Sequence, residues 1–229
     1  MITKGLSIII GSIAVAALTI IVVMKYFRMP SENLRKSFHF ALLFVVTVWL
    51  YAFDDWKVSA IMMLVFLILA FPVLCLFDRI PSIRKHLPER SKGEFKQSLF
   101  AAATMYIIVV MIGWGLMKQR SLCLAALYAW GPGDAAAALI GKRYGKTKIG
   151  KQKKKSLEGS ASMFLISFIS VFSILSCTDT FDPSQTLAVS FFTALVTAIV
   201  ELYTMSGYDT FFCPVAAVIT LSMFKYLMR

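Results

Sequence analysis

The chain has 229 residues, of which 59% are hydrophobic and 16% charged, and its mean hydropathy is +0.75. This composition excludes an ordinary soluble domain and predicts a membrane protein. The net charge of +12 does not indicate nucleic-acid binding, because the sequence contains no nucleic-acid-binding module.

Eight stretches are apolar enough for helices through a bilayer, whose core of about 30 Å needs roughly 20 apolar residues. In chain order they are 5–24, 37–53, 58–77, 97–117, 121–141, 159–178, 183–200 and 210–224. The eighth is short, so we expect seven or eight transmembrane helices in one domain, 1–229, of the all-α class. A cleaved signal peptide is the alternative for the first stretch, but no small-residue cleavage motif follows it.

Basic residues are concentrated in three connections, which predicts the orientation of the chain. The segments 25–36, 79–96 and 142–155 hold 4, 6 and 8 Lys or Arg residues, which is 18 of the 24. Because basic loops stay in the cytoplasm, we expect these loops inside and the N-terminus outside. Much of this charge has a simple alternative role, which is topology and attraction to anionic lipid.

The second stretch begins with the cluster Arg35, Lys36 and His39. Arg35 and His39 are four residues apart and therefore share one helical face. Such a group can hold phosphate oxygens. The alternative interpretation is positive-inside flanking with a histidine packed in the bundle.

The fifth stretch contains Asp134 directly after Gly131-Pro132-Gly133. We expect this Gly-Pro-Gly to break the helix within the membrane and to free backbone groups. A carboxylate at membrane depth is costly and usually has a functional partner. Its hard oxygen atoms suit Mg²⁺, which takes one or two carboxylates and substrate phosphates. A packing break with Asp134 paired to a loop lysine is the alternative.

A basic, glycine-rich loop follows at about 141–157, on the predicted cytoplasmic side. Gly145-Lys146-Thr147 suggests a P-loop, but Ile140 stands where that motif needs glycine, and a helix rather than a strand precedes it. The loop could still hold polyphosphate through backbone N–H groups and lysines. We expect Ser156 to cap the next helix and Glu158 to lie in its first turn.

Glu201 and Asp209, on either side of Gly207, follow the seventh stretch and face the same side as Asp134. They could ligate a metal or act as a base. Solvation of the helix ends is the alternative.

These residues resemble the motifs of the CTP-dependent lipid kinases, the group of dolichol kinase, phytol kinase and CTP-dependent diacylglycerol kinase. The resemblance is carried by Gly-Asp-Ala-Ala-Ala-Ala-Leu-Ile-Gly-Lys-Arg-Tyr-Gly at 133–145 and Lys-Ser-Leu-Glu-Gly-Ser at 155–160. Arg35-Lys36-x-x-His39 resembles an early motif, and Glu201 to Pro214 a closing one. One departure is Tyr208-Asp209-Thr210, where the family often has two acids and an asparagine.

The resemblance implies transfer of the γ-phosphate of CTP, with Mg²⁺, to the hydroxyl of a membrane lipid such as a polyprenol, phytol or diacylglycerol. The expected catalytic residues are Asp134, Arg35, Lys36, His39 and Glu158, with His39, Glu158 and Asp209 as alternative proton acceptors. Expected metal ligands are Asp134, Glu201 and Asp209. Expected nucleotide-binding residues are Gly133, Gly141, Lys142, Arg143, Gly145, Lys155, Ser156 and Gly159.

Two other functions compete with this hypothesis. The related phosphatidate cytidylyltransferases also use CTP but transfer CMP rather than phosphate. A transporter or lipid scaffold, with Asp134 and Glu201 as intramembrane ion sites, is disfavoured because the sequence has no inverted repeat.

Overall fold

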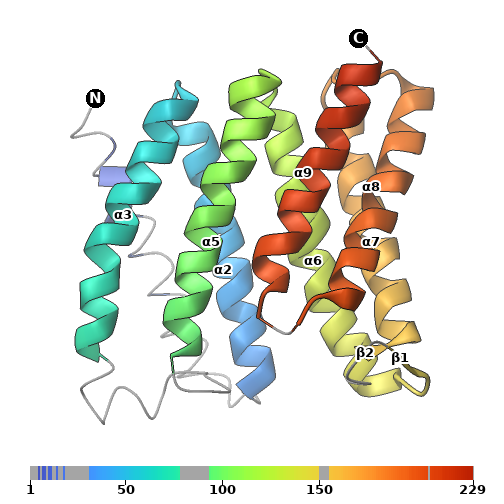
Figure 1. Cartoon of the computed structure of the whole chain (residues 1–229), viewed down its shortest axis with the longest axis horizontal. Helices are drawn as coiled ribbons and strands as arrows, with labels where there is room; N and C mark the ends of the chain where they lie inside the picture. Colours follow the sequence, from blue (N-terminus) through green and yellow to red (C-terminus); the bar gives the residue numbers. More distant parts are fainter. Residues whose placement is uncertain are drawn as a thin grey trace. The chain divides into compact units, whose positions relative to one another are not determined.

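A computed structural model describes residues 31–77, 93–149, 155–205 and 207–228, together with seven isolated positions between Gly5 and Leu18. For some of these residues, Arg35 among them, only the backbone is described. The chain divides into two compact units, Met1–Ile107 and Ile108–Arg229. Figure 1 shows the helices of both units. That the units form the single domain expected from the sequence stays a prediction.

The first unit contains α2 (Ser31–Ala52), α3 (Trp56–Phe77) and most of α5 (Glu94–Val109). Trp49 is fully buried and makes edge-on ring contacts with Phe53 and Phe66. The hydroxyls of Ser59 and Tyr106 lie 2.7 Å apart and join α3 to α5. Because both hydroxyls are buried, this bond satisfies two polar groups inside an otherwise apolar packing.

The second unit is an antiparallel bundle that follows a short π-helix, η1 (Val110–Leu116). Its long helices are α6 (Arg120–Tyr144), α7 (Leu157–Ser176), α8 (Pro183–Tyr203) and α9 (Asp209–Leu227). Two short antiparallel strands, β1 (Lys148–Ile149) and β2 (Lys155–Ser156), pair between α6 and α7. This hairpin is an addition to the all-α fold expected from the sequence. It lies at the bundle end where α6 ends and α7 begins (Figure 1).

The expected helix break at Gly131-Pro132-Gly133 is wrong, because α6 continues through all three residues to Tyr144. Proline removes only one N–H from the helical hydrogen bonds, and a packed membrane helix tolerates that loss. Close packing on α7 supports this part of α6. A Cβ atom on Gly133 would lie only 2.5 Å from Ser167 Oγ, and that hydroxyl donates to the Ala129 carbonyl. The glycine therefore serves helix packing here.

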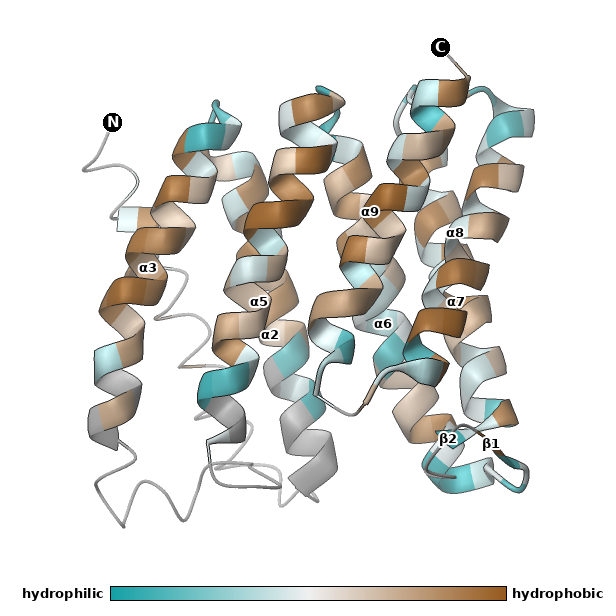
Figure 2. Ribbon diagram, in the orientation of Figure 1, coloured by the Kyte–Doolittle hydropathy of each residue, from teal (hydrophilic) through white to brown (hydrophobic). Residues whose placement is uncertain are grey.

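Among the described residues, five helices are long and apolar enough to cross a bilayer: Lys96–Leu116, Arg120–Tyr144, Leu157–Ser176, Pro183–Tyr203 and Asp209–Leu227. Two shorter apolar helices are His39–Ala52 and Trp56–Pro72. In the second unit, apolar residues cover the helices and hydrophilic ones gather around the hairpin (Figure 2). These features support an all-α, multi-pass membrane protein. The expected first span lies largely outside the described residues, so a count of eight spans and the outside N-terminus stay predictions.

Candidate functional site

Three acidic residues from three helices are buried close to one another in the second unit. Asp134 lies in α6, Glu201 in the last turn of α8 and Asp209 at the start of α9, and they are 5%, 7% and 9% exposed. The charges of all three act on the buried thiol of Cys213 in α9. This places Asp134, Glu201 and Asp209 around one region, which we call the acid cluster.

The acid cluster lies against the apolar core of the bundle. Cys213 packs with Trp130 of α6, Met163 of α7 and Ala198 of α8, which all belong to one buried cluster. Carboxylates in such surroundings are costly unless they are paired or bind a cation. The protein therefore maintains three acids at a place where packing alone would favour apolar side chains.

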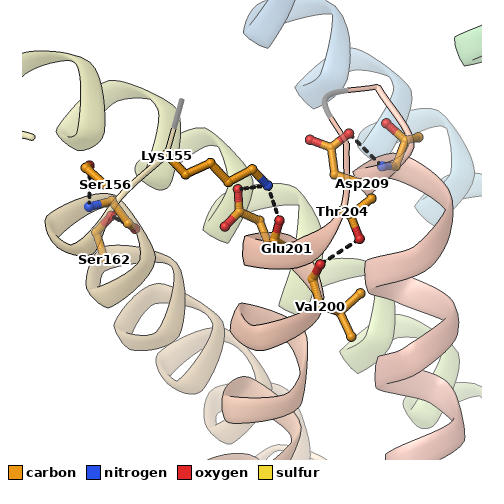
Figure 3. A network of polar contacts seen from close by, with 9 residues as sticks. Lys155, Ser156, Ser162, Val200, Glu201, Thr204 and Asp209 are labelled. Atoms are coloured by element: carbon orange, nitrogen blue, oxygen red, sulfur yellow. Dashed lines mark hydrogen bonds and ion pairs between the residues drawn. The ribbon is translucent and has the colours of Figure 1, made fainter. Parts of the chain in front are cut away.

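Lys155 brings the hairpin to the acid cluster. Its ammonium lies 2.7 Å from Glu201 Oε1, and it also donates to the Glu201 backbone carbonyl. Figure 3 shows the lysine extending from β2 to the end of α8. The lysine side chain is 19% exposed and that of the glutamate 9%, so the ion pair is largely shielded from water. Lys155 therefore fixes the position of the hairpin relative to Glu201.

The turn between α8 and α9 positions the third acid. Gly207 has φ = +98°, a backbone conformation that residues other than glycine rarely adopt. Asp209 then begins α9, and its Oδ1 accepts from the Thr210 backbone N–H at 3.0 Å. The Thr204 hydroxyl donates to the Val200 carbonyl at 2.6 Å and thereby satisfies the end of α8 (Figure 3). The turn therefore returns the chain so that Glu201 and Asp209 lie near each other.

The glycines of the loop are packing residues around Ser156. A Cβ atom on Gly141 would lie 3.0 Å from Ser156 Oγ, and one on Gly145 would lie 2.6 Å from it. A Cβ on Gly159 would lie 2.9 Å from the Ala137 carbonyl. The three glycines thus let the end of α6 and the start of α7 approach closely. Their expected role in nucleotide binding stays a prediction.

Ser156 and Glu158 have the helix-start positions expected from the sequence. Ser156 Oγ accepts from the Gly159 N–H at 3.2 Å, which confirms the cap. Glu158 Oε1 accepts from the N–H groups of Lys146 and Thr147, at 3.1 and 3.2 Å. The carboxylate therefore binds two consecutive backbone donors of the loop and holds the loop against α7.

The side chains of the loop present positive charge around the hairpin. Lys142 and Arg143 lie in the last turn of α6, and both are exposed, as are Lys146 and Lys148. Among the described residues, none of these four forms an ion pair within 4.0 Å. The remaining lysines of the run, Lys151, Lys153 and Lys154, lie outside the described residues. The loop therefore offers several cations for an anionic ligand.

The residues expected at the early motif belong to the first unit. Arg35 lies within α2, and its side chain is outside the described residues. Lys36 follows it and is only 4% exposed, and His39 is half-buried one turn later. A lysine so deeply buried is unusual unless its charge is compensated. The expected participation of Arg35, Lys36 and His39 in the site of the second unit stays a prediction.

The described residues contain no group of three His, Cys, Asp or Glu side chains arranged to hold a metal ion. The expected ligand set of Asp134, Glu201 and Asp209 is thus gathered in one region without forming a finished coordination site. Sequence reasoning missed the Lys155–Glu201 pair. The available signal was the isolated position of Glu201 at an apolar helix end, which predicts a cationic partner without identifying it.

Parts of the chain are similar to two known kinases. An 80-residue stretch, 34% of the chain, is 44% identical to the dolichol kinase sec59 of Schizosaccharomyces pombe and covers 15% of that protein. A 63-residue stretch, 28% of the chain, is 33% identical to a Triticum aestivum protein named "Probable phytol kinase, chloroplastic" and covers 20% of it. The matched parts thus span a fifth or less of either relative.

No family model matches the chain. No solved structure matches it either. The two partial similarities are to proteins whose names describe a dolichol kinase and a probable phytol kinase.

Proposed function

We propose that the chain is an integral membrane kinase that transfers the γ-phosphate of CTP to the hydroxyl of a lipid alcohol. The acid cluster carries this proposal. Three carboxylates from α6, α8 and α9 are buried at the end of the bundle that also bears the basic hairpin. Phosphoryl transfer needs little more from a protein than positioning and the neutralisation of phosphate charge. The partial similarity to two kinases supports the same reaction class.

The acid cluster fits Mg²⁺ as the accompanying ion. Its donors are carboxylate oxygens, and Glu201 is already neutralised by Lys155. We propose that Asp134 would hold the ion, in line with the one or two carboxylates that Mg²⁺ usually takes beside substrate phosphates. When bound, it would neutralise charge on the phosphate oxygens.

The loop of 141–157 would bind the triphosphate through its exposed cations, with Glu158 and Ser156 holding its shape. Because Glu158 Oε1 already accepts two backbone hydrogen bonds, Glu158 is better suited to this positioning role than to accepting a proton. Asp209 is the proton acceptor that we propose. The lipid O–H gives its proton to the carboxylate, its oxygen bonds to the γ-phosphorus, and the bond to the β-phosphate oxygen breaks, which releases CDP.

We also propose that the acid cluster and the basic loop face the cytoplasm, where CTP is available. This follows from the basic residues of the loop and from the positive-inside rule. The host membrane would then be a bacterial cytoplasmic membrane or the endoplasmic reticulum.

The proposal is tested with membranes that contain the protein, a panel of lipid alcohols and CTP labelled at either the α- or the γ-phosphate. We expect the γ-label in lipid and no α-label. The α-label in lipid would instead establish a cytidylyltransferase. If gel filtration shows that the protein is folded and neither label enters any lipid, both reactions are excluded and a transporter or scaffold remains.

A further inference from the structure

An open apolar pocket of about 540 Å³ is lined by residues next in the chain to Glu201 and Asp209. Its lining side chains come from the end of α8, the following turn and the start of α9: Ile199, Val200, Tyr203, Thr204, Met205, Tyr208 and Phe212. We call it the tail pocket. None of these side chains is charged, and the Thr204 hydroxyl is occupied by its bond to the Val200 carbonyl. The pocket therefore suits a hydrocarbon ligand and offers no binding site for phosphate.

The tail pocket shares its helix ends with two of the acids. Glu201 follows the lining residue Val200 in the chain, and Asp209 follows Tyr208. The volume is in the range of small-molecule sites, roughly 300 to 1,000 Å³, although the pocket is open on one side. Glu201 and Asp209 are themselves buried and do not line the pocket, so a ligand would have its apolar body against the aromatic side chains and its polar end toward the turn that carries the two acids.

The position at the ends of two membrane-spanning helices identifies the source of such a ligand. Tyr203 and Tyr208 are 69% and 45% exposed, and aromatic residues of this kind gather at the boundary between hydrocarbon and water. A lipid chain could enter the pocket from the bilayer while its polar end stays at the boundary.

We propose that the tail pocket binds the part of a single-chain lipid alcohol next to its hydroxyl and directs that hydroxyl to the acid cluster. The inference rests on the proposed kinase function, for which it supplies the acceptor site. Ile199, Tyr203, Met205 and Phe212 hold the chain, and Asp209 faces the oxygen that becomes phosphorylated.

The experiment measures binding of tritiated phytol to the full chain in phosphatidylcholine nanodiscs without nucleotide. Ile199→Trp fills the pocket, and its matched control is Ile219→Trp in α9, because the two isoleucines are 46% and 43% exposed and Ile219 is outside the pocket. We expect saturable binding that Ile199→Trp weakens about tenfold or more and Ile219→Trp leaves within about twofold. Equal binding by both variants, or no saturable binding over the phosphatidylcholine background, overturns the proposal.

A second pair of variants tests the pocket independently, in case a variant of the first pair misfolds. Met205→Trp acts from the turn instead of the helix, and Met223→Trp is its control, with exposures of 61% and 59%. The variants used are those whose thermal unfolding matches that of the unmodified protein. Met205→Trp should weaken phytol binding as Ile199→Trp does.

Transfer of the γ-label separates failure of the pocket from failure of the kinase function. If the protein phosphorylates phytol and Ile199→Trp leaves the KM for phytol unchanged, the pocket assignment is wrong while the kinase stands. If phytol binds, Ile199→Trp weakens it and no label is transferred to any alcohol, the pocket stands and the kinase function is wrong.

Discussion

The two ends of the second unit treat their charged residues differently. At the hairpin end, three acids are buried and Lys155 pairs with one of them. At the opposite end, Lys225 of α9 donates to the Thr180 carbonyl at 2.5 Å and lies over the Phe181 ring. There, Arg120 lies over the Trp114 ring, 3.9 Å from its centroid.

The cations at the opposite end make contacts that stabilise the fold, whereas the burial of three acids at the hairpin end costs desolvation free energy. Contacts of a cation with a ring or with a backbone carbonyl are each worth about 1 kcal/mol. Burial of a carboxylate carries a desolvation cost, which at the hairpin end is opposed by the Lys155–Glu201 pair and by the hydrogen bond from the Thr210 N–H to Asp209. The comparison therefore agrees with the proposed site at the hairpin end and with a stabilising role for the charges at the other.

The largest effect is expected from Asp134→Asn. The substitution keeps the shape and removes the charge, so γ-phosphate transfer should fall by about a hundredfold or more. The helix should still insert, because asparagine is no more costly there than aspartate. The control is Asp179→Asn in the exposed turn at the opposite end, which should retain full activity. Undiminished transfer by Asp134→Asn would remove Asp134 from the site.

Breaking the Lys155–Glu201 pair should reduce stability as well as activity. Glu201→Gln leaves the ammonium of Lys155 without its carboxylate, which we expect to cost about 2 kcal/mol because the lysine keeps some contact with water. Thermal unfolding of Glu201→Gln, Lys155→Met and the double variant gives the coupling energy, expected at about 1–2 kcal/mol. Additive effects of the two substitutions would contradict a stabilising pair.

Glu158 offers a test of positioning against proton transfer. Glu158→Gln keeps an oxygen that can accept from Lys146 and Thr147, whereas Glu158→Ala removes it. We expect Gln to keep at least about a tenth of the activity and Ala to lose considerably more, chiefly through a higher KM for CTP. Equal loss of kcat in both variants would instead assign Glu158 to proton transfer.

The packing of the loop can be tested at Gly145. In Gly145→Ala the new Cβ would overlap the Gly141 carbonyl and lie 2.6 Å from Ser156 Oγ, so the end of α6 must shift. Overpacking of this kind costs about 1–3 kcal/mol, to be read from thermal unfolding. Gly11→Ala is the control, since a Cβ there meets nothing within 4 Å. Similar unfolding temperatures for both variants would show that the loop is not tightly packed.

The smallest effect is expected at the opposite end. Lys225→Met removes one hydrogen bond and one ring contact, so the free energy of unfolding should fall by about 1 kcal/mol. Transfer of γ-phosphate should be unchanged, because the site lies at the other end of the bundle. A loss of activity comparable with that of Glu201→Gln would abolish the distinction between the two ends.

Helix positions follow from the sequence because hydropathy acts locally. The uncharged stretch 159–178 corresponds to α7, Leu157–Ser176, and 183–200 lies within α8, Pro183–Tyr203. The cap at Ser156 was also predictable, because an N-cap needs only a side-chain oxygen and the next turn of the same helix. Counting spans predicted that Asp134, Glu201 and Asp209 lie on one side of the membrane, and the structure places the three buried residues in one region of the second unit.

The tertiary structure alone decided how these residues meet. Pro132 predicts a break in isolation, yet packing against α7 keeps α6 continuous. Lys155 and Glu201 are 46 residues apart, and no local pattern relates them. Pairing at that separation depends on how four helices pack, and packing is determined by the shapes of all their side chains at once. The sequence therefore determined which residues could do chemistry, and the packing decided that Glu201 is neutralised, that Glu158 holds the loop and that an apolar pocket lies beside Asp209.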